Sequence, residues 1–186
     1  MSKEMLDVVG IGNAIVDVLA RTDDAFLQEN RINKGTMTLV DMAAAEALYE
    51  KMGSTTQVSG GSAANTIAGL ASMGAKTGYI GKVAHDQLGK AFGHDIRALG
   101  VAFETQPLIM GTPTARCMIF ITPDAQRTMC TYLGACVMLT PEDISEDMIK
   151  NSKVTYLEGY LFDRDHAKEA FRRAARIATA AGRKVA

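Results

Sequence analysis

The chain of 186 residues has no tryptophan, three cysteines and four prolines. An odd number of cysteines without a CxxC pair argues against a disulfide framework and against a structural zinc site. The net charge of −1 provides no overall attraction for nucleic acid or for an anionic membrane. The first residues include acids where a signal peptide needs a basic region, and no apolar run reaches the roughly 18 residues of a membrane span. We therefore expect a soluble, cytoplasmic protein without nucleic-acid or membrane partners.

Short apolar runs alternate with helical patterns along most of the chain. Apolar runs typical of buried strands cover residues 8–11, 77–83 and 154–157. Helical patterns cover residues 41–52, 62–73, 86–99 and 165–181, and a further helix is expected to start at Thr140 and Pro141. This order predicts an α/β fold in which a mostly parallel central sheet is flanked by helices.

The middle of the chain follows a different pattern. Residues 114–122 and 126–133 form two strand patterns joined by the turn tripeptide at 123–125, which predicts an antiparallel hairpin. Extended segments are also expected near residues 14–20 and 36–40. We interpret these segments, near 14–20, 36–40 and 114–134, as a small sheet beside the main one.

The last residues, 183–186, have the pattern of a new strand. A parallel sheet that ended there would leave an unpaired edge. We therefore expect residues 1–186 to be the N-terminal part of a longer single domain, with its C-terminal part missing.

Several familiar motifs are incomplete. Residues 10–15 begin like a dinucleotide fingerprint, but Ile15 stands in place of the last glycine, which argues against a NAD-dependent oxidoreductase. Gly81-Lys82 is followed by Val83, which has no hydroxyl for Mg²⁺, so a phosphate-binding loop is not indicated. No metal site is expected from the three histidines, and the cysteines are expected to be small packing residues. These are His85, His94 and His166, and Cys117, Cys130 and Cys136.

A first candidate binding element lies at residues 12–17. In an extended strand, residues four apart point to the same face, so Asn13 and Asp17 project together. A carboxylate accepts hydroxyl protons and an amide both donates and accepts, which suits a polyol. The alternative is that Asn13 caps a turn and Asp17 is a solvated strand residue.

A second candidate element lies at residues 59–65. Gly60 and Gly61 precede a helix, where a missing Cβ lets a ligand approach the backbone and free N–H groups offer donors. Asn65 is expected in the first helical turn, facing the same space. The alternative is a plain Gly-Gly turn with Ser62 as N-cap, which would leave Asn65 as a poor helix residue without a purpose.

Together these elements resemble the ribokinase (PfkB) family of carbohydrate and nucleoside kinases. The similarity is most specific over residues 59–89, which read SGGSAANTIAGLASMGAKTGYIGKVAHDQLG, and it extends over essentially the whole chain. The spacing of Gly12, Asn13 and Asp17 resembles the adenosine kinase-like branch, since ribokinases place the Asp two after the Asn. Ser62 stands where ribokinases commonly have lysine.

The resemblance implies a single ribokinase-like α/β domain with a small β-sheet lid, and transfer of the ATP γ-phosphoryl to a primary hydroxyl with Mg²⁺. It implies that a nucleoside or sugar is held by Asp17, Gly60, Gly61 and Asn65, with Asn13 supporting the pocket and Glu158 at its base. Apolar lid residues would cover a flat base or would be ordinary core packing. These lid residues are Met118, Phe120 and Leu133.

The sequence departs from the family in two motifs. The family's catalytic Asp lies in a Gly-Ala-Gly-Asp motif, which does not occur here, and an N-x-x-E motif linked to Mg²⁺ is also absent. The catalytic Asp is therefore expected beyond Ala186, and neither ATP nor Mg²⁺ is expected to bind this chain tightly. A sugar kinase of the same family and an inactive acceptor-binding fragment stay as alternatives, and the resemblance allows a homodimer formed through the lid.

Overall fold

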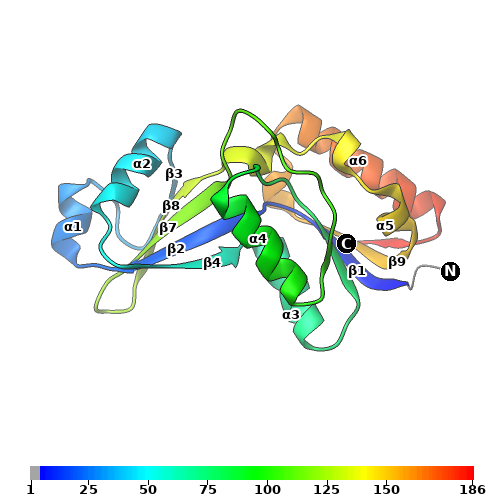
Figure 1. The fold of residues 1–186 in the computed structure, drawn as a ribbon, viewed down its shortest axis with the longest axis horizontal. Coiled ribbons are helices and arrows are strands. Elements are labelled where there is room, and N and C mark those ends of the chain that lie inside the picture. The colour runs from blue at the N-terminus through cyan, green and yellow to red at the C-terminus, as the bar shows by residue number, and fades with distance from the viewer. Residues whose placement is uncertain (1–4) are drawn as a thin grey trace.

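The computed structural model describes residues 5–186, which form two sheets with separate helical layers (Figure 1). The first sheet is five-stranded, in the order β10-β9-β1-β5-β6, and every neighbouring pair is parallel. Its strands are β1 (Leu6–Ile11), β5 (Thr77–Ile80), β6 (Ala102–Phe103), β9 (Ser152–Leu157) and β10 (Lys184–Val185). Their apolar runs are nearly continuous because helices bury both faces of the sheet.

The helices divide between the two faces of this sheet (Figure 1). On one face, α3 (Ser62–Ser72) and α4 (Gln87–Ala98) share a core with Tyr79 of β5. On the other face, α5 (Glu146–Lys150) and α6 (Asp165–Ala180) share a core with Val9 of β1. The buried residues of α6 recur at helical spacing, as an amphipathic helix requires. The α/β fold with a parallel sheet flanked by helices is therefore confirmed.

Several boundaries differ from the sequence prediction, most clearly at β5 and after Thr140. β5 ends at Ile80 rather than at Val83. The helix expected from Thr140 is a short 3₁₀ turn, Pro141–Asp143, followed by α5; Thr140 and Asp143 close a capping box there. Two further 3₁₀ turns cover Gly134–Met138 and Gly159–Leu161. Within residues 5–186, no helix combines the length and the apolar character needed to cross a membrane.

The second sheet is five-stranded and mixed, in the order β3-β8-β7-β2-β4. Its strands are β2 (Ile15–Arg21), β3 (Met37–Leu39), β4 (Thr55–Gly60), β7 (Ala115–Ile121) and β8 (Arg127–Tyr132). β7 and β8 form the predicted antiparallel hairpin, and the extended segments near 14–20 and 36–40 supply β2 and β3. The sequence did not predict β4, because an edge strand that reads TTQVSG has little apolar alternation.

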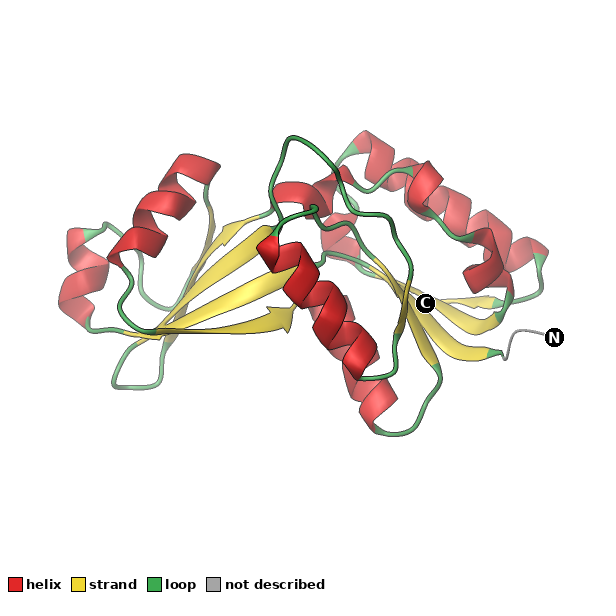
Figure 2. Cartoon of the chain, in the orientation of Figure 1, coloured by secondary structure: helices red, strands yellow, loops and turns green. Residues whose placement is uncertain are grey.

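The two faces of the second sheet differ in character (Figure 2). α1 (Asp24–Glu29), which the sequence did not predict, and α2 (Met42–Lys51) cover one face, where Leu27 and Ala45 join its core. The other face carries the alternate strand positions, including Met37 and Leu39, which are 52% and 58% exposed. This second face is therefore open and partly apolar.

The site is positioned by the strand order of the parallel sheet. From β1 the chain proceeds to β5 and β6 on one side, and later to β9 and β10 on the other. The boundary between β1 and β9 is thus a topological switch point, where ligands of open α/β sheets bind beside the carboxyl ends of the strands. Residues 12–14, which carry the chain from β1 to β2, and Glu158, which follows β9, lie at this boundary.

Candidate functional site

Glu158 organises the switch point through its carboxylate. The side chain is only 3% exposed. Its Oε2 accepts from the backbone N–H of Asn13 at 2.7 Å, and its Oε1 accepts from the backbone N–H of Ala63 at 2.9 Å and from the Ser62 hydroxyl. The same carboxylate therefore binds the β1–β2 connection and the N-terminus of α3. It supplies an acceptor there because the first N–H groups of a helix have no partner within the helix.

Two glycines let these segments approach one another. A Cβ at Gly12 would lie 2.8 Å from Glu158 Oε2 and 2.7 Å from the Ala63 Cβ. Gly61 has φ of +100°, and a Cβ there would lie 2.2 Å from the carbonyl oxygen of Asn13. Gly61, rather than Ser62, occupies the N-cap position of α3, so the Ser62 hydroxyl is free to donate to Glu158 instead of capping the helix.

A cavity of about 360 Å³ opens between the two sheets at this point. Asn13, Ser62 and Glu158 form a polar floor on the side of the parallel sheet, and the second sheet forms a largely apolar wall. The remaining lining residues are Ile15, Met37, Leu39, Met129, Thr131, Leu133 and Tyr160. Asn13 is 5% exposed, and its Oδ1 has no hydrogen-bond partner among the described residues. Because buried polar atoms are normally paired, this acceptor is suited to a donor on a bound molecule.

Asp17 lies on β2, two residues after Ile15, which lines this cavity, and strand alternation puts both on the same face. Its carboxylate packs against Gly60, where a Cβ would lie 2.5 Å from Asp17 Oδ2. Partial burial raises the pKa of the Asp17 carboxyl above its ordinary value, and the positive charge of Arg127 opposes this in part. A partly desolvated carboxylate next to a bare stretch of backbone suits hydroxyl recognition, and Gly60 is required there because any side chain would displace the carboxylate.

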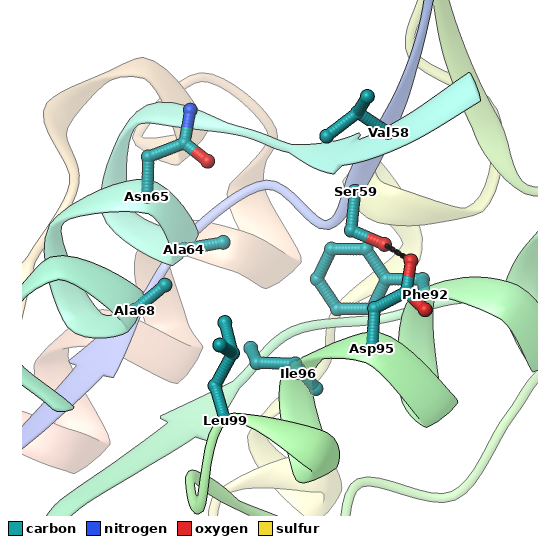
Figure 3. Close-up of a pocket in the computed structure, with 9 residues that line it drawn as sticks. All are labelled: Val58, Ser59, Ala64, Asn65, Ala68, Phe92, Asp95, Ile96 and Leu99. Carbon is teal, nitrogen blue, oxygen red and sulfur yellow. Dashed lines mark hydrogen bonds between the residues drawn. The ribbon is translucent and has the colours of Figure 1, made fainter. Parts of the chain in front are cut away.

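Asn65 lies in the first turn of α3, as the sequence predicted. It is exposed and lines a smaller cavity of about 130 Å³ between α3 and α4 (Figure 3). Val58, the strand partner of Asp17, also lines this smaller cavity. Directly paired residues of antiparallel strands project to the same face, so Val58 and Asp17 share one face of the second sheet. That Asn65 faces the same space as Asn13 and Asp17 stays a prediction.

The lid residues also separate. Leu133 lines the cavity of about 360 Å³. Met118 and Phe120 are fully buried beneath α1 and α2, and Phe120 packs on Phe26 with ring centroids 5.2 Å apart. Their burial fits the second of the two expectations, ordinary core packing, because strand alternation points both side chains at the helices.

Sequence reasoning missed the cavity-facing positions of β3 and β8. Met37 and Leu39 on β3, and Met129 and Thr131 on β8, alternate with residues that face the helices. That alternation was visible in the sequence, but it does not reveal which face is open. The histidines do not meet, and no group of three or more His, Cys, Asp or Glu side chains within residues 5–186 could hold a metal ion. The cysteines are free and buried, and desolvation raises the pKa of Cys117 to about 11.

A parallel α/β sheet with a cavity at its switch point and a second sheet over that cavity is the arrangement in which open α/β sheets bind small molecules. The family model of pfkB family carbohydrate kinases matches residues 7–186, and the chain belongs to this family. It is also 29% identical to a 5-dehydro-2-deoxygluconokinase from Listeria monocytogenes over 182 residues, which is 95% of this chain and 49% of the relative. The chain spans about half the length of the curated relatives it matches.

Solved structures show the same fold. An adenosine kinase from Sinorhizobium meliloti matches with a TM-score of 0.90 and 58% identity, over 97% of this chain and 55% of that one. A probable sugar kinase from Rhizobium etli matches with a TM-score of 0.90 and 52% identity, over 98% and 55%. An adenosine kinase from Schistosoma mansoni, at 21% identity and a TM-score of 0.82 over 96% and 53%, shares the fold. The predicted ribokinase-like fold and family are thereby confirmed.

Proposed function

We propose that this chain is the acceptor-binding part of an ATP-dependent nucleoside kinase of the adenosine kinase type, which transfers the γ-phosphoryl to a primary hydroxyl. The observation that carries the proposal is the composition of the cavity. Its wall of Leu39, Met129 and Leu133 suits a flat base, and its floor of Asn13 and Glu158 suits the hydroxylated part of a nucleoside.

The chain's own residues would bind and orient the acceptor. Asn13 Oδ1 would accept a hydroxyl proton, and the Asp17 carboxylate beside Gly60 would accept another. Gly61, whose missing Cβ makes room for the carbonyl oxygen of Asn13, would contact the sugar through its backbone. Asn65, at the neighbouring cavity, stays a predicted contact. Phosphoryl transfer depends on positioning and on excluding water, and we assign the second sheet to that covering role as the lid.

ATP and Mg²⁺ would supply the phosphoryl group and neutralise its charge when bound. The donors on this chain do not fit a metal centre, because Asp17 lies alone on its strand and the Glu158 carboxylate is already occupied by three donors. We therefore assign no step to these residues through Mg²⁺. The full-length protein would provide the catalytic Asp and most of the ATP site.

A sugar kinase is the second candidate, supported by the identity to 5-dehydro-2-deoxygluconokinases and to a probable sugar kinase. A sugar acid would use the polar floor but would leave the apolar wall uncovered. A catalytically silent acceptor-binding fragment is the third. The free, buried thiols suit the reducing cytoplasm. A homodimer formed through the open apolar face of the second sheet stays an expectation, which sedimentation analysis would test.

Titration calorimetry on this chain with adenosine, ribose and 5-dehydro-2-deoxygluconate tests the proposal. We expect saturable heat with adenosine and weaker binding of the other two. Asp17→Ala is expected to abolish the adenosine signal with unchanged circular dichroism. Glu50→Ala, which alters an exposed carboxylate on α2, is the control and is expected to bind like the wild type. Tighter binding of a sugar than of adenosine would overturn the nucleoside assignment.

A further inference from the structure

β2 and β7, two adjacent parallel strands of the second sheet, enter that sheet at the same level, with Ile15 beside Ala115. The residues just before them are held by carboxylates of the parallel-sheet unit, by which we mean the first sheet with α3, α4, α5 and α6. Asn13 donates its backbone N–H to Glu158 Oε2 at 2.7 Å, and Thr114 donates its backbone N–H to Asp86 Oδ2 at 2.8 Å. The two connections are therefore fixed in the same way, by long-range hydrogen bonds from the strand root to a carboxylate.

The Asp86 contact is as elaborate as the Glu158 contact. Asp86 Oδ1 accepts from the backbone N–H of Gly89 at 2.8 Å and from the Thr114 hydroxyl at 2.6 Å. Thr114 Oγ1 accepts in turn from the backbone N–H of Ala84 at 2.9 Å. Each carboxylate thus binds the residue at the start of a strand, a hydroxyl group and the N-terminus of a helix. The helix is α3 for Glu158 and α4 for Asp86.

The D-x-x-G sequence at residues 86–89 is explained by this junction. A Cβ at Gly89 would lie 2.0 Å from the carbonyl oxygen of Ala84 and 2.9 Å from Thr114 Oγ1. Thr114 is 1% exposed, so its hydroxyl has no water to replace these partners. Partial burial raises the pKa of Asp86, but the bonds from Thr114 and Gly89 outweigh it and leave the pKa below its ordinary value.

The other aspartate N-caps within residues 5–186 lack the second attachment. Asp41 accepts from Ala44 N–H at 2.8 Å at the start of α2, and Asp23 accepts from Phe26 N–H at 2.9 Å at the start of α1. In both cases the partner belongs to the capped helix itself. Helix capping therefore explains only the bond from Gly89, and the two bonds from Thr114 require a different purpose.

We propose that Asp86 is a positioning residue that, through Thr114, sets the separation and angle of the second sheet over the acceptor cavity. The inference rests on the proposed function, because the cavity takes its apolar wall from the second sheet and its polar floor from the parallel-sheet unit. Asp86 itself does not line the cavity, so it acts on ligand affinity only by holding the root of β7, the central strand of the sheet.

Four variants distinguish the Asp86–Thr114 hydrogen bonds, here called the clamp, from the capping of α4 by Asp86. Asp86→Asn keeps an amide oxygen that can cap α4 at the place of Oδ1, but it puts an NH₂ group at the place of Oδ2, against the backbone N–H of Thr114. Thr114→Val removes the hydroxyl, and Thr114→Ser restores it. Asp41→Asn is the matched control, because it changes the same residue type at a cap that has no second attachment.

Two measurements are made on each variant of the chain. Spin labels at Glu50→Cys on α2 and Ser72→Cys on α3 report, without ligand, the distance between the second sheet and the parallel-sheet unit. Calorimetry reports adenosine affinity. We expect Asp86→Asn and Thr114→Val to broaden the distance distribution and to weaken adenosine binding about tenfold. Thr114→Ser and Asp41→Asn are expected to match the wild type in both.

An unchanged distance distribution in Asp86→Asn and Thr114→Val would overturn the proposal. If Thr114→Val does not fold, Asp86→Asn decides the result. Should the wild-type chain bind no nucleoside, the proposed function fails, while the ligand-free distances still support or refute the clamp by themselves.

Discussion

The backbone N–H of Asn13 donates to Glu158 Oε2 at 2.7 Å, although the two residues are 145 positions apart in sequence. Because Glu158 also accepts from Ala63 and Ser62, one buried carboxylate joins β1, α3 and β9 at the site. The charge of Glu158 is therefore used to build the cavity floor, which distinguishes it from Asp17, whose carboxylate has no protein donor among the described residues and stays available to a ligand.

Glu158→Gln is expected to destabilise the fold by about 2–4 kcal/mol, because its NH₂ group would face backbone donors that now bind an oxygen. Urea unfolding followed by circular dichroism measures the change. Ser62→Ala removes only one of the donors and is expected to lose about 1 kcal/mol. Glu146→Gln, on the exposed Lys150 pair, is the control and should change stability by under about 0.5 kcal/mol. A Glu158→Gln midpoint equal to that of Glu146→Gln would contradict this reading.

Gly61→Ala is expected to destabilise the protein by more than about 3 kcal/mol, since it adds a Cβ 2.2 Å from the Asn13 carbonyl at φ of +100°. Gly69→Ala, in the same helix, is the matched control. Nothing lies within 4 Å of a Cβ at Gly69, so this variant should gain about 0.5–1 kcal/mol of stability. Thermal unfolding of both variants checks the prediction, which fails if the two melt at the same temperature.

Asp17→Asn is expected to raise stability at pH 7 and to weaken adenosine binding by about tenfold or more. Burial raises the folded-state pKa of Asp17, with Arg127 opposing it, so the folded protein holds the proton more tightly than the unfolded chain does. Ionisation then works against folding, and this contribution to stability falls as pH rises from the ordinary carboxyl range through the raised pKa.

Unfolding curves of the Asp17→Asn variant and the wild type between pH 3 and 8 measure this effect. The two curves should coincide at the acidic end, where Asp17 is protonated in both states, and should separate in favour of Asn as pH rises. A variant that is less stable than the wild type at pH 7 would show that the Asp17 carboxylate is a structural group rather than one kept for a ligand.

Leu39→Ala is expected to weaken adenosine binding about three- to tenfold without loss of stability, because Leu39 is 58% exposed and lines the apolar wall of the cavity. Met73→Ala is the matched control, since Met73 is 77% exposed at the C-cap of α3 and lies outside that cavity. Ribose binding should be equal in both variants. Calorimetry that finds the same adenosine affinity for Leu39→Ala and Met73→Ala would argue against a base on this wall.

Local sequence patterns predicted much of the fold. The apolar runs of β1 and β9, the turn of the β7–β8 hairpin and the helices predicted over 41–52 and 86–99 follow from periodicity and from the chemistry of neighbouring residues. β4 and α1 were not predicted, because an edge strand and a short surface helix bury too few residues to produce a clear apolar pattern.

The amino-acid sequence by itself determined the α/β alternation, the second sheet and the Gly60-Gly61 opening before α3, because each depends on residues close together in the chain. Tertiary structure alone decided which side chains share a space. Strand alternation could not tell that Met118 faces the helices, nor helical position that Asn65 lines a cavity with residues of α4, nor spacing that Glu158 bonds to Asn13. Those outcomes depend on how distant segments pack, because which face of a strand or helix is buried is decided by the element that packs against it.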